Sequence, residues 1–119
     1  MAMKITQLAE LIEARMVVQP QTATREITRA CAGDRISDML AHANADTLVI
    51  THVNGPGLAR MLELLDVGAL CLVGRPVPDP LLVAVAEEHG TPLLVAREEL
   101  FEVCGRVYAA IKADADGAP

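Results

Sequence analysis

The chain of 119 residues is acidic, with a net charge of −6 and a pI of about 4.9. Hydrophobic residues make up 52% of it and aromatic residues only 2%, so a nucleic acid would meet neither a positive surface nor rings for base stacking. No apolar run reaches the about 20 residues of a membrane-spanning helix, and Glu10 and Glu13 argue against a signal peptide. We therefore expect one cytoplasmic domain over residues 1–112 and a flexible tail over residues 113–119.

Residue types that form metal or redox sites are present but scattered. Cys31, Cys71 and Cys104 lie far apart in apolar sequence and lack the Cys-x-x-Cys spacing of a zinc or redox site. The three histidines share no metal-ligand spacing either. We expect buried, reduced cysteines, no metal and no cofactor.

The first 43 residues predict two amphipathic helices and two short strands. Apolar residues recur with helical spacing near the amino terminus and again after Gly33. Thr6 can cap the first helix and Asp34 the second. The expected elements, in chain order, cover residues 6–12, 16–18, 26–31 and 34–43.

A strand–loop–helix unit then occurs twice, with turn residues at matching places. Each unit has a short apolar run, a loop rich in glycine and proline, and a segment with helical periodicity. Asp79 and Gly90 are suited to be the N-cap and C-cap of the second helix. A third strand and a last helix follow. The expected elements cover residues 47–51, 58–66, 70–73, 79–89, 93–95 and 97–112.

Successive units of this kind place their strands side by side and parallel, because the crossovers are right-handed. The predicted fold class is α/β, a three-layer α/β/α sandwich with a mostly parallel central sheet, in which the N-terminal strands can be antiparallel. The last helix is expected to face the core with an apolar stripe: Leu100, Phe101, Cys104, Val107, Tyr108 and Ile111. Alternatively, the outer edge of this stripe continues into a partner subunit. Close packing is expected to compensate for Gly105 in this helix.

Four short motifs occur in a distinctive order: Asp34-Arg35-Ile36-Ser37-Asp38-Met39-Leu40, Ile50-Thr51-His52, Gly74-Arg75 and Phe101-Glu102-x-x-Gly105-Arg106-x-Tyr108. Together they resemble the DRTGG domain family, over residues 4–112. The resemblance implies a fold similar to the N-terminal domain of HPr kinase/phosphorylase, a regulatory role and no assigned catalytic activity. The naming motif of the family, Asp-Arg-x-x-Thr-Gly-Gly, corresponds here to residues 24–30. Arg25 and Thr28 are kept, whereas Thr24, Arg29 and Ala30 replace the aspartate and the two glycines.

The loops after the strands over 47–51 and 70–73 are the best candidate for a ligand site. Carboxyl ends of neighbouring parallel strands meet at one edge of a sheet, and the first amides of a following helix can receive an anion. The expected ligand contacts are Thr51, His52, Asn54, Gly55, Gly57, Gly74 and Arg75. Neither loop has the spacing of a P-loop or of a dinucleotide-binding motif. The alternative is that these residues only turn the chain.

Four secondary candidates are Arg25, Thr28, Asp34 and Asp38. Arg25 and Thr28 are candidates because the resemblance implies a role for the motif to which they belong. Asp34 and Asp38 lie one helical turn apart, where carboxylates can serve acid–base chemistry, bind a divalent cation or stabilise a helix start. His52 can carry a proton or be a hydrogen-bonded loop residue. Arg75 can pair with a ligand anion or with a nearby carboxylate such as that of Asp79.

These features predict a non-catalytic regulatory or sensory domain that binds a small polar or anionic ligand, a nucleotide being one option. The alternative is a protein-interaction or scaffold domain that docks on a metabolic enzyme through apolar helix faces. A small hydrolase or phosphoryl-transfer enzyme using Asp34, Asp38 and His52 is the least favoured function. The mean hydropathy of +0.34 is high for a 12.6 kDa chain, so we also expect a homodimer.

Overall fold

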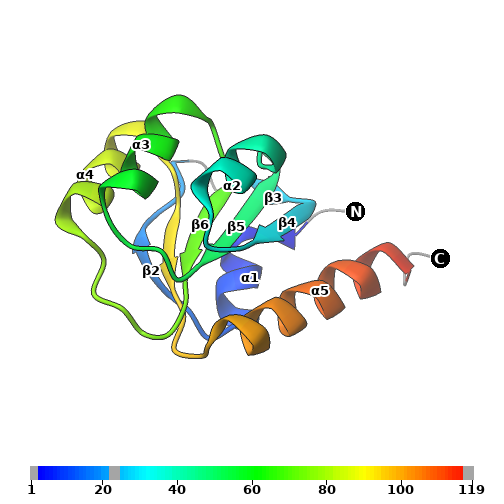
Figure 1. The fold of residues 1–119 in the computed structure, drawn as a ribbon. Coiled ribbons are helices and arrows are strands. Elements are labelled where there is room, and N and C mark those ends of the chain that lie inside the picture. Colours follow the sequence, from blue (N-terminus) through cyan, green and yellow to red (C-terminus); the bar gives the residue numbers. More distant parts are fainter. Residues whose placement is uncertain (1–2, 22–24, 117–119) are drawn as a thin grey trace.

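The computed structural model describes residues 3–21 and 25–116, with side chains described up to residue 113 (Figure 1). It contains seven strands and five helices within these residues. The strands are β1 (Met3–Lys4), β2 (Arg15–Val18), β3 (Glu26–Ile27), β4 (Arg29–Ala32), β5 (Thr47–Thr51), β6 (Ala69–Leu72) and β7 (Leu93–Val95). The helices are α1 (Ile5–Leu11), α2 (Ile36–His42), α3 (Pro56–Leu64), α4 (Pro80–His89) and α5 (Leu100–Asp116).

The central sheet has five strands in the order β2-β7-β6-β5-β4. Strands β4 to β7 are parallel to one another, and β2 is antiparallel to β7. The strand expected over residues 26–31 is two strands, because the amides of Thr28 and Arg29 both donate to the carbonyl of Asp46 and the chain changes partner there. Upstream, β3 pairs with β1 in a separate antiparallel pair, whereas β4 joins the main sheet beside β5.

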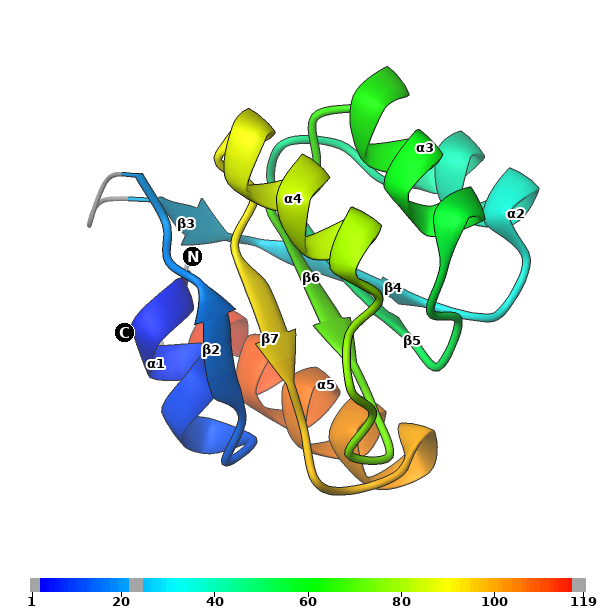
Figure 2. The same cartoon turned by 90° about the vertical axis from the view of Figure 1, so that its left-hand side faces the viewer.

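Helices cover both faces of this sheet, which confirms the predicted three-layer α/β/α sandwich. Helices α2, α3 and α4 lie on one face, and α1 and α5 lie on the other (Figure 2). Every residue of β5 and β6 is buried because each strand meets an apolar layer on both sides. Side chains alternate along a strand: Val49 packs toward α3, whereas Leu48 and Ile50 pack toward α1 and α5.

Cap chemistry explains where the best-predicted helix begins and ends. The carboxylate of Asp79 accepts a hydrogen bond of 2.8 Å from the amide of Leu81, and Pro80 occupies the first turn. Gly90 ends α4 in the left-handed conformation, with φ of 68°. The expected cap at Asp34 is wrong, because α2 begins only at Ile36 and Arg35 is its N-cap.

The amino-terminal helix also differs in its start. It begins at Ile5 rather than after Thr6, and the side chain of Gln7 accepts a hydrogen bond of 2.9 Å from the amide of Lys4. Leu8 and Ile12 are buried as predicted, whereas Leu11 is exposed.

The last helix meets the sheet with a narrower face than expected. Val103 and Val107 are buried, but Phe101 is 84% exposed and Tyr108 is 68% exposed. The close packing expected at Gly105 is wrong, since no heavy atom other than those of the helix's own nearby backbone lies within 4 Å of where its Cβ would be. The helix runs to Asp116 instead of Lys112, and residues 117–119 of the predicted tail lie outside the described residues.

In the part of the chain that the structure describes, no helix combines the length and the apolar character needed to cross a membrane.

Candidate functional site

A polar residue follows each of the four parallel strands within three positions of its end. These residues are Arg97 after β7, Arg75 after β6, His52 after β5 and Asp34 after β4. Because the strands are neighbours in that order, the four residues follow one another along the carboxyl edge of the sheet. The predicted location of the candidate site is therefore an edge where charged and polar side chains gather.

His52 and Asp34 meet at the β4–β5 end of this edge. The Nε2 atom of His52 lies 3.8 Å from Oδ2 of Asp34, and more than half of each side chain is exposed. An exposed pair of this kind contributes less than about 1 kcal/mol to stability. Oδ2 of Asp38, in contrast, lies 3.8 Å from Nε of Arg35, the N-cap of α2, so Asp34 and Asp38 each have a different partner.

Asn54 connects the two candidate loops. Its Nδ2 atom donates to the carbonyl oxygen of Val77 over 2.8 Å, and its Oδ1 atom accepts from the amide of Asp79 over 2.8 Å. The hydroxyl of Thr51, which is fully buried, accepts a hydrogen bond of 3.1 Å from the amide of Val53. Asn54 and Thr51 thus hold the loops in place, and a ligand would compete with these bonds.

The start of α3 has few amides left for an anion. Pro56 has no N–H, and the amides of Leu58 and Ala59 both donate to the carbonyl of Gly55. Gly57 is exposed, with only Ile36 near the place of a Cβ atom. The ligand role predicted for Gly55 and Gly57 stays a prediction.

Gly74 and Arg75 form a tight turn against the loop that follows β7. Gly74 has φ of 82° and Arg75 has φ of 56°, both in the left-handed region. Their amides donate to the carbonyls of Glu98 and Ala96 over 2.8 and 2.9 Å. The left-handed conformation costs a non-glycine residue about 1–2 kcal/mol, so these bonds hold Arg75 against its preference. The expected alternative partner, Asp79, caps α4 and forms no ion pair with Arg75.

Arg75 lines two adjacent cavities, of about 410 and 330 Å³. Glu13, Arg75 and Arg97 line both of them, Arg15 lines the larger, and Arg106 lines the smaller. None of their lining residues comes from the loop over residues 51–57. The two halves of the predicted site share one edge of the sheet, but only the half at Arg75 opens into these cavities.

Arg25 and Thr28 lie at the other edge of the sheet. Arg25 donates to the carbonyl of Gly90 over 3.1 Å and pairs with Asp66 over 3.2 Å. Thr28 donates to Oδ2 of Asp46 over 2.8 Å, and this bond lowers the pKa of that carboxyl. These partners precede β7, β6 and β5, so both residues tie down the amino ends of the strands. Thr24, the first residue of this motif, lies outside the described residues.

Sequence reasoning missed Arg15 and Arg97. Arg97 follows β7 as Arg75 follows β6, so the repeated pattern of strand and loop could have indicated it. Arg15 belongs to β2, and only the pairing of β2 with β7 brings it to this edge, where it lies opposite Val95. No local pattern in the sequence indicates that pairing.

The cysteines offer no reactive thiol or metal site. Burial raises the pKa of the Cys71 thiol to about 12, and burial also raises the pKa of Cys31 and of Cys104. All three are free, and they stay protonated near neutral pH. Among the described residues, no three histidine, cysteine or acidic side chains gather as a metal site would need.

Comparisons with known proteins show the fold. No model of a known protein family matches the chain, and no curated protein is significantly similar to it in sequence. The structure is similar to the CBS and DRTGG domains of the regulatory region of Clostridium perfringens pyrophosphatase, in complex with the activator diadenosine tetraphosphate. The TM-score is 0.70 at 11% identity, and the match covers 87% of this chain and 45% of that one.

The chain therefore spans less than half the length of this structural neighbour. The likeness to a protein with a DRTGG domain supports the fold that the sequence motifs implied. Membership of the DRTGG family stays a prediction.

Proposed function

We propose that this chain is a non-catalytic regulatory domain that binds a small polar or anionic ligand at the carboxyl ends of its parallel strands. One observation carries the proposal: Arg75 and Arg97 follow neighbouring strands, line the same cavities, and have no ion pair among the described residues. Guanidinium groups without a protein partner are available to a ligand anion. The amide of Gly74 already donates to the carbonyl of Glu98, so this residue would shape the turn that presents Arg75, and the loop over residues 51–57 would add further contacts.

The structural neighbour supports a regulatory role and a nucleotide as one class of ligand. That protein is the regulatory region of an enzyme, and its structure contains a nucleotide activator. The present chain shares the fold but not the sequence, so its own ligand is to be found by experiment.

The arrangement of polar side chains favours binding over catalysis. Asp34 and His52 form an acid–histidine pair, but solvent reaches both side chains, and no thiol or serine is paired with this histidine in the described part of the chain. If the protein were instead a hydrolase or phosphoryl-transfer enzyme, His52→Ala would abolish turnover in a folded variant.

A thermal-shift panel of nucleotides, phosphorylated metabolites and coenzymes tests the proposed function. A ligand at 100 times its dissociation constant should stabilise the fold by about 2.7 kcal/mol, which is several degrees for a domain of this size. Arg75→Gln should remove the shift, because the cation that attracts the anion is lost. Failure of every compound to raise the melting temperature would contradict the proposal.

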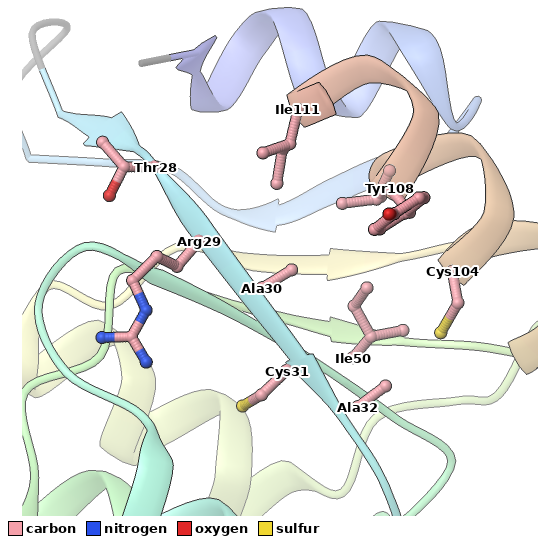
Figure 3. Close-up of a pocket in the computed structure, with 10 residues that line it drawn as sticks. Thr28, Arg29, Ala30, Cys31, Ala32, Ile50, Cys104, Tyr108 and Ile111 are labelled. Atoms are coloured by element: carbon pink, nitrogen blue, oxygen red, sulfur yellow. The ribbon is translucent and has the colours of Figure 1, made fainter. Parts of the chain in front are cut away.

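A specific surface favours protein interaction as a second function. Both aromatic residues of the chain, Phe101 and Tyr108, are exposed on α5. An apolar groove of about 410 Å³ lies beside Tyr108, between α5 and β4, the edge strand of the sheet. Figure 3 shows Ala30 and Ala32 pointing toward the side where Cys104 and Ile111 lie, whereas Cys31 points to the other face. We propose that a second copy of the chain covers this groove.

The mass of the protein in solution tests the homodimer. Light scattering after size-exclusion chromatography should give twice the chain mass of 12.6 kDa at low micromolar concentration. Tyr108→Glu should produce monomers, because a charge would be buried at the interface. Val77→Glu is the control, since Val77 is 87% exposed and lies on the β6–α4 loop, outside the groove. A wild-type protein that runs as a monomer would rule out this interface.

A further inference from the structure

Three arginines without protein partners converge on the two cavities at the β6–β7 end of the carboxyl edge. Within the described residues, four arginines have neither an ion pair nor a side-chain hydrogen bond: Arg15, Arg60, Arg75 and Arg97. Three of these four line the larger cavity, and Arg75 and Arg97 also line the smaller one. In a chain of net charge −6, unpaired positive charges are therefore concentrated at one corner.

The fold brings the three side chains from three different elements. Arg15 begins β2 and lies opposite Val95 in the neighbouring strand, so it reaches the end of β7. Arg97 follows β7 directly, and Arg75 is fixed beside it by the bond of 2.9 Å from its amide to the carbonyl of Ala96. The three guanidinium groups therefore approach the cavities from β2 and from the loops after β6 and β7.

The two glutamates that line the cavities already have a partner. Arg106 on α5 places Nη1 3.3 Å from Oε2 of Glu13 and Nη2 2.8 Å from Oε1 of Glu98. Both carboxylates therefore pair with Arg106, the fourth arginine at the cavities. Among the residues that line the cavities, four arginines against two glutamates leave an excess of positive charge on Arg15, Arg75 and Arg97. The carboxylate of Glu99 lies near Gly74 but lines neither cavity.

Three converging guanidinium groups select a particular kind of anion. A single carboxylate is planar and offers its oxygens in one plane, whereas the oxygens of a phosphate group face several directions. The larger cavity, of about 410 Å³, has the size of a site for a small organic ligand. Mutual repulsion of three unpaired cations is relieved best by a ligand that brings at least two negative charges.

We propose that Arg15, Arg75 and Arg97 form a binding site for a compact ligand with two or more phosphate charges, such as a diphosphate group. This inference rests on the proposed function, because it names the class of ligand and moves the contacts from the loop over residues 51–57 to the arginine cavities. A diphosphate occurs both as the free inorganic ion and as part of an organic metabolite, and the arginines would recognise the group common to both.

Calorimetric titration with inorganic pyrophosphate tests this site, with orthophosphate and citrate as comparison anions and ionic strength held constant. Pyrophosphate should bind more tightly than either. Arg97→Gln should weaken its binding at least about tenfold, the loss expected for a charge-assisted hydrogen bond. Arg60→Gln is the matched control: Arg60 is an exposed, unpaired arginine on α3, and its distant charge should change affinity by less than about twofold.

The outcomes separate this inference from the proposed function. Equal weakening by Arg97→Gln and Arg60→Gln, no binding of pyrophosphate, or preference for citrate would overturn it. A compound from the thermal-shift panel that binds Arg97→Gln as tightly as the wild type would overturn the site and leave the regulatory function standing. A diphosphate-containing metabolite that binds more tightly than pyrophosphate and is equally sensitive to Arg97→Gln would identify the organic source of the group.

Discussion

Gly68→Ala is expected to lower the free energy of unfolding by about 2–3 kcal/mol, as overpacking of a closed core does. A Cβ atom at this position would lie 2.5 Å from Cδ1 of Ile27 and 2.9 Å from the carbonyl oxygens of Ala45 and Thr47. Two of these three atoms are backbone, so a change of rotamer cannot relieve the contact. The amide of Gly68 also donates to the carbonyl of Thr47 over 3.0 Å, and moving the chain would break that bond. Urea denaturation measures the effect.

Gly105→Ala is the matched control for this substitution. Gly105 lies in α5 with open space around the place of a Cβ atom, so the change should raise stability by up to about 1 kcal/mol. If both variants unfold at the wild-type urea concentration, the close approach at Gly68 is not as the structure describes it.

Leu62→Ala should cost about 2–5 kcal/mol of stability, the range for removing a leucine side chain from a core. Leu62 lies on α3, is 2% exposed, and belongs to the core between the sheet and helices α2 to α4. The truncation removes apolar burial and leaves a cavity that neighbouring side chains fill only in part. Because α3 begins at the loop tied by Asn54, this loss also weakens the support of the carboxyl edge.

Leu64→Ala makes the same chemical change two residues further along the same helix. Leu64 is 70% exposed, so its truncation should change stability by no more than about 0.5 kcal/mol. Both variants replace leucine by alanine on α3, and Leu64 is the last residue of that helix, so the larger loss expected for Leu62→Ala reports its burial. Equal midpoints would mean that α3 does not pack with the face that the structure shows.

The layers and the best-defined helix ends could be predicted because their causes are local. Apolar periodicity distinguishes strand from helix within a few residues, and the caps at Asp79 and Gly90 act within one turn. The parallel order of β5, β6 and β7 then follows from right-handed crossovers.

Features set by distant partners could not be predicted in the same way. Apolar residues occur on more than one face of α5, so the sequence does not say whether Phe101 or Val103 meets the sheet. The break between β3 and β4 depends on the carbonyl of Asp46, which lies far along the chain. Arg15 reaches the arginine cavities only through the pairing of β2 with β7.

The structure places Gly74 and Arg75 after β6, at the carboxyl edge of the sheet, and the ligand contacts predicted there are all still to be tested. The hydroxyl of Thr51 accepts from the amide of Val53 in a local turn, whereas the partners of Asn54 lie on the distant β6–α4 loop, which no local pattern indicates. Arg97 could have been found from the sequence, because it follows the predicted strand over residues 93–95 as Arg75 follows the predicted strand over residues 70–73.

If a small anion binds at the carboxyl edge of the sheet, the backbone amides there will shift during a titration with pyrophosphate. In the ¹⁵N-labelled protein, saturable shifts should concentrate on residues 13–16, 74–75 and 96–99, and Arg97→Gln should raise the pyrophosphate concentration at their midpoint at least about tenfold. Saturable shifts at the amino edge around Arg25 and Thr28, or along the groove between β4 and α5, would show that the anion binds elsewhere.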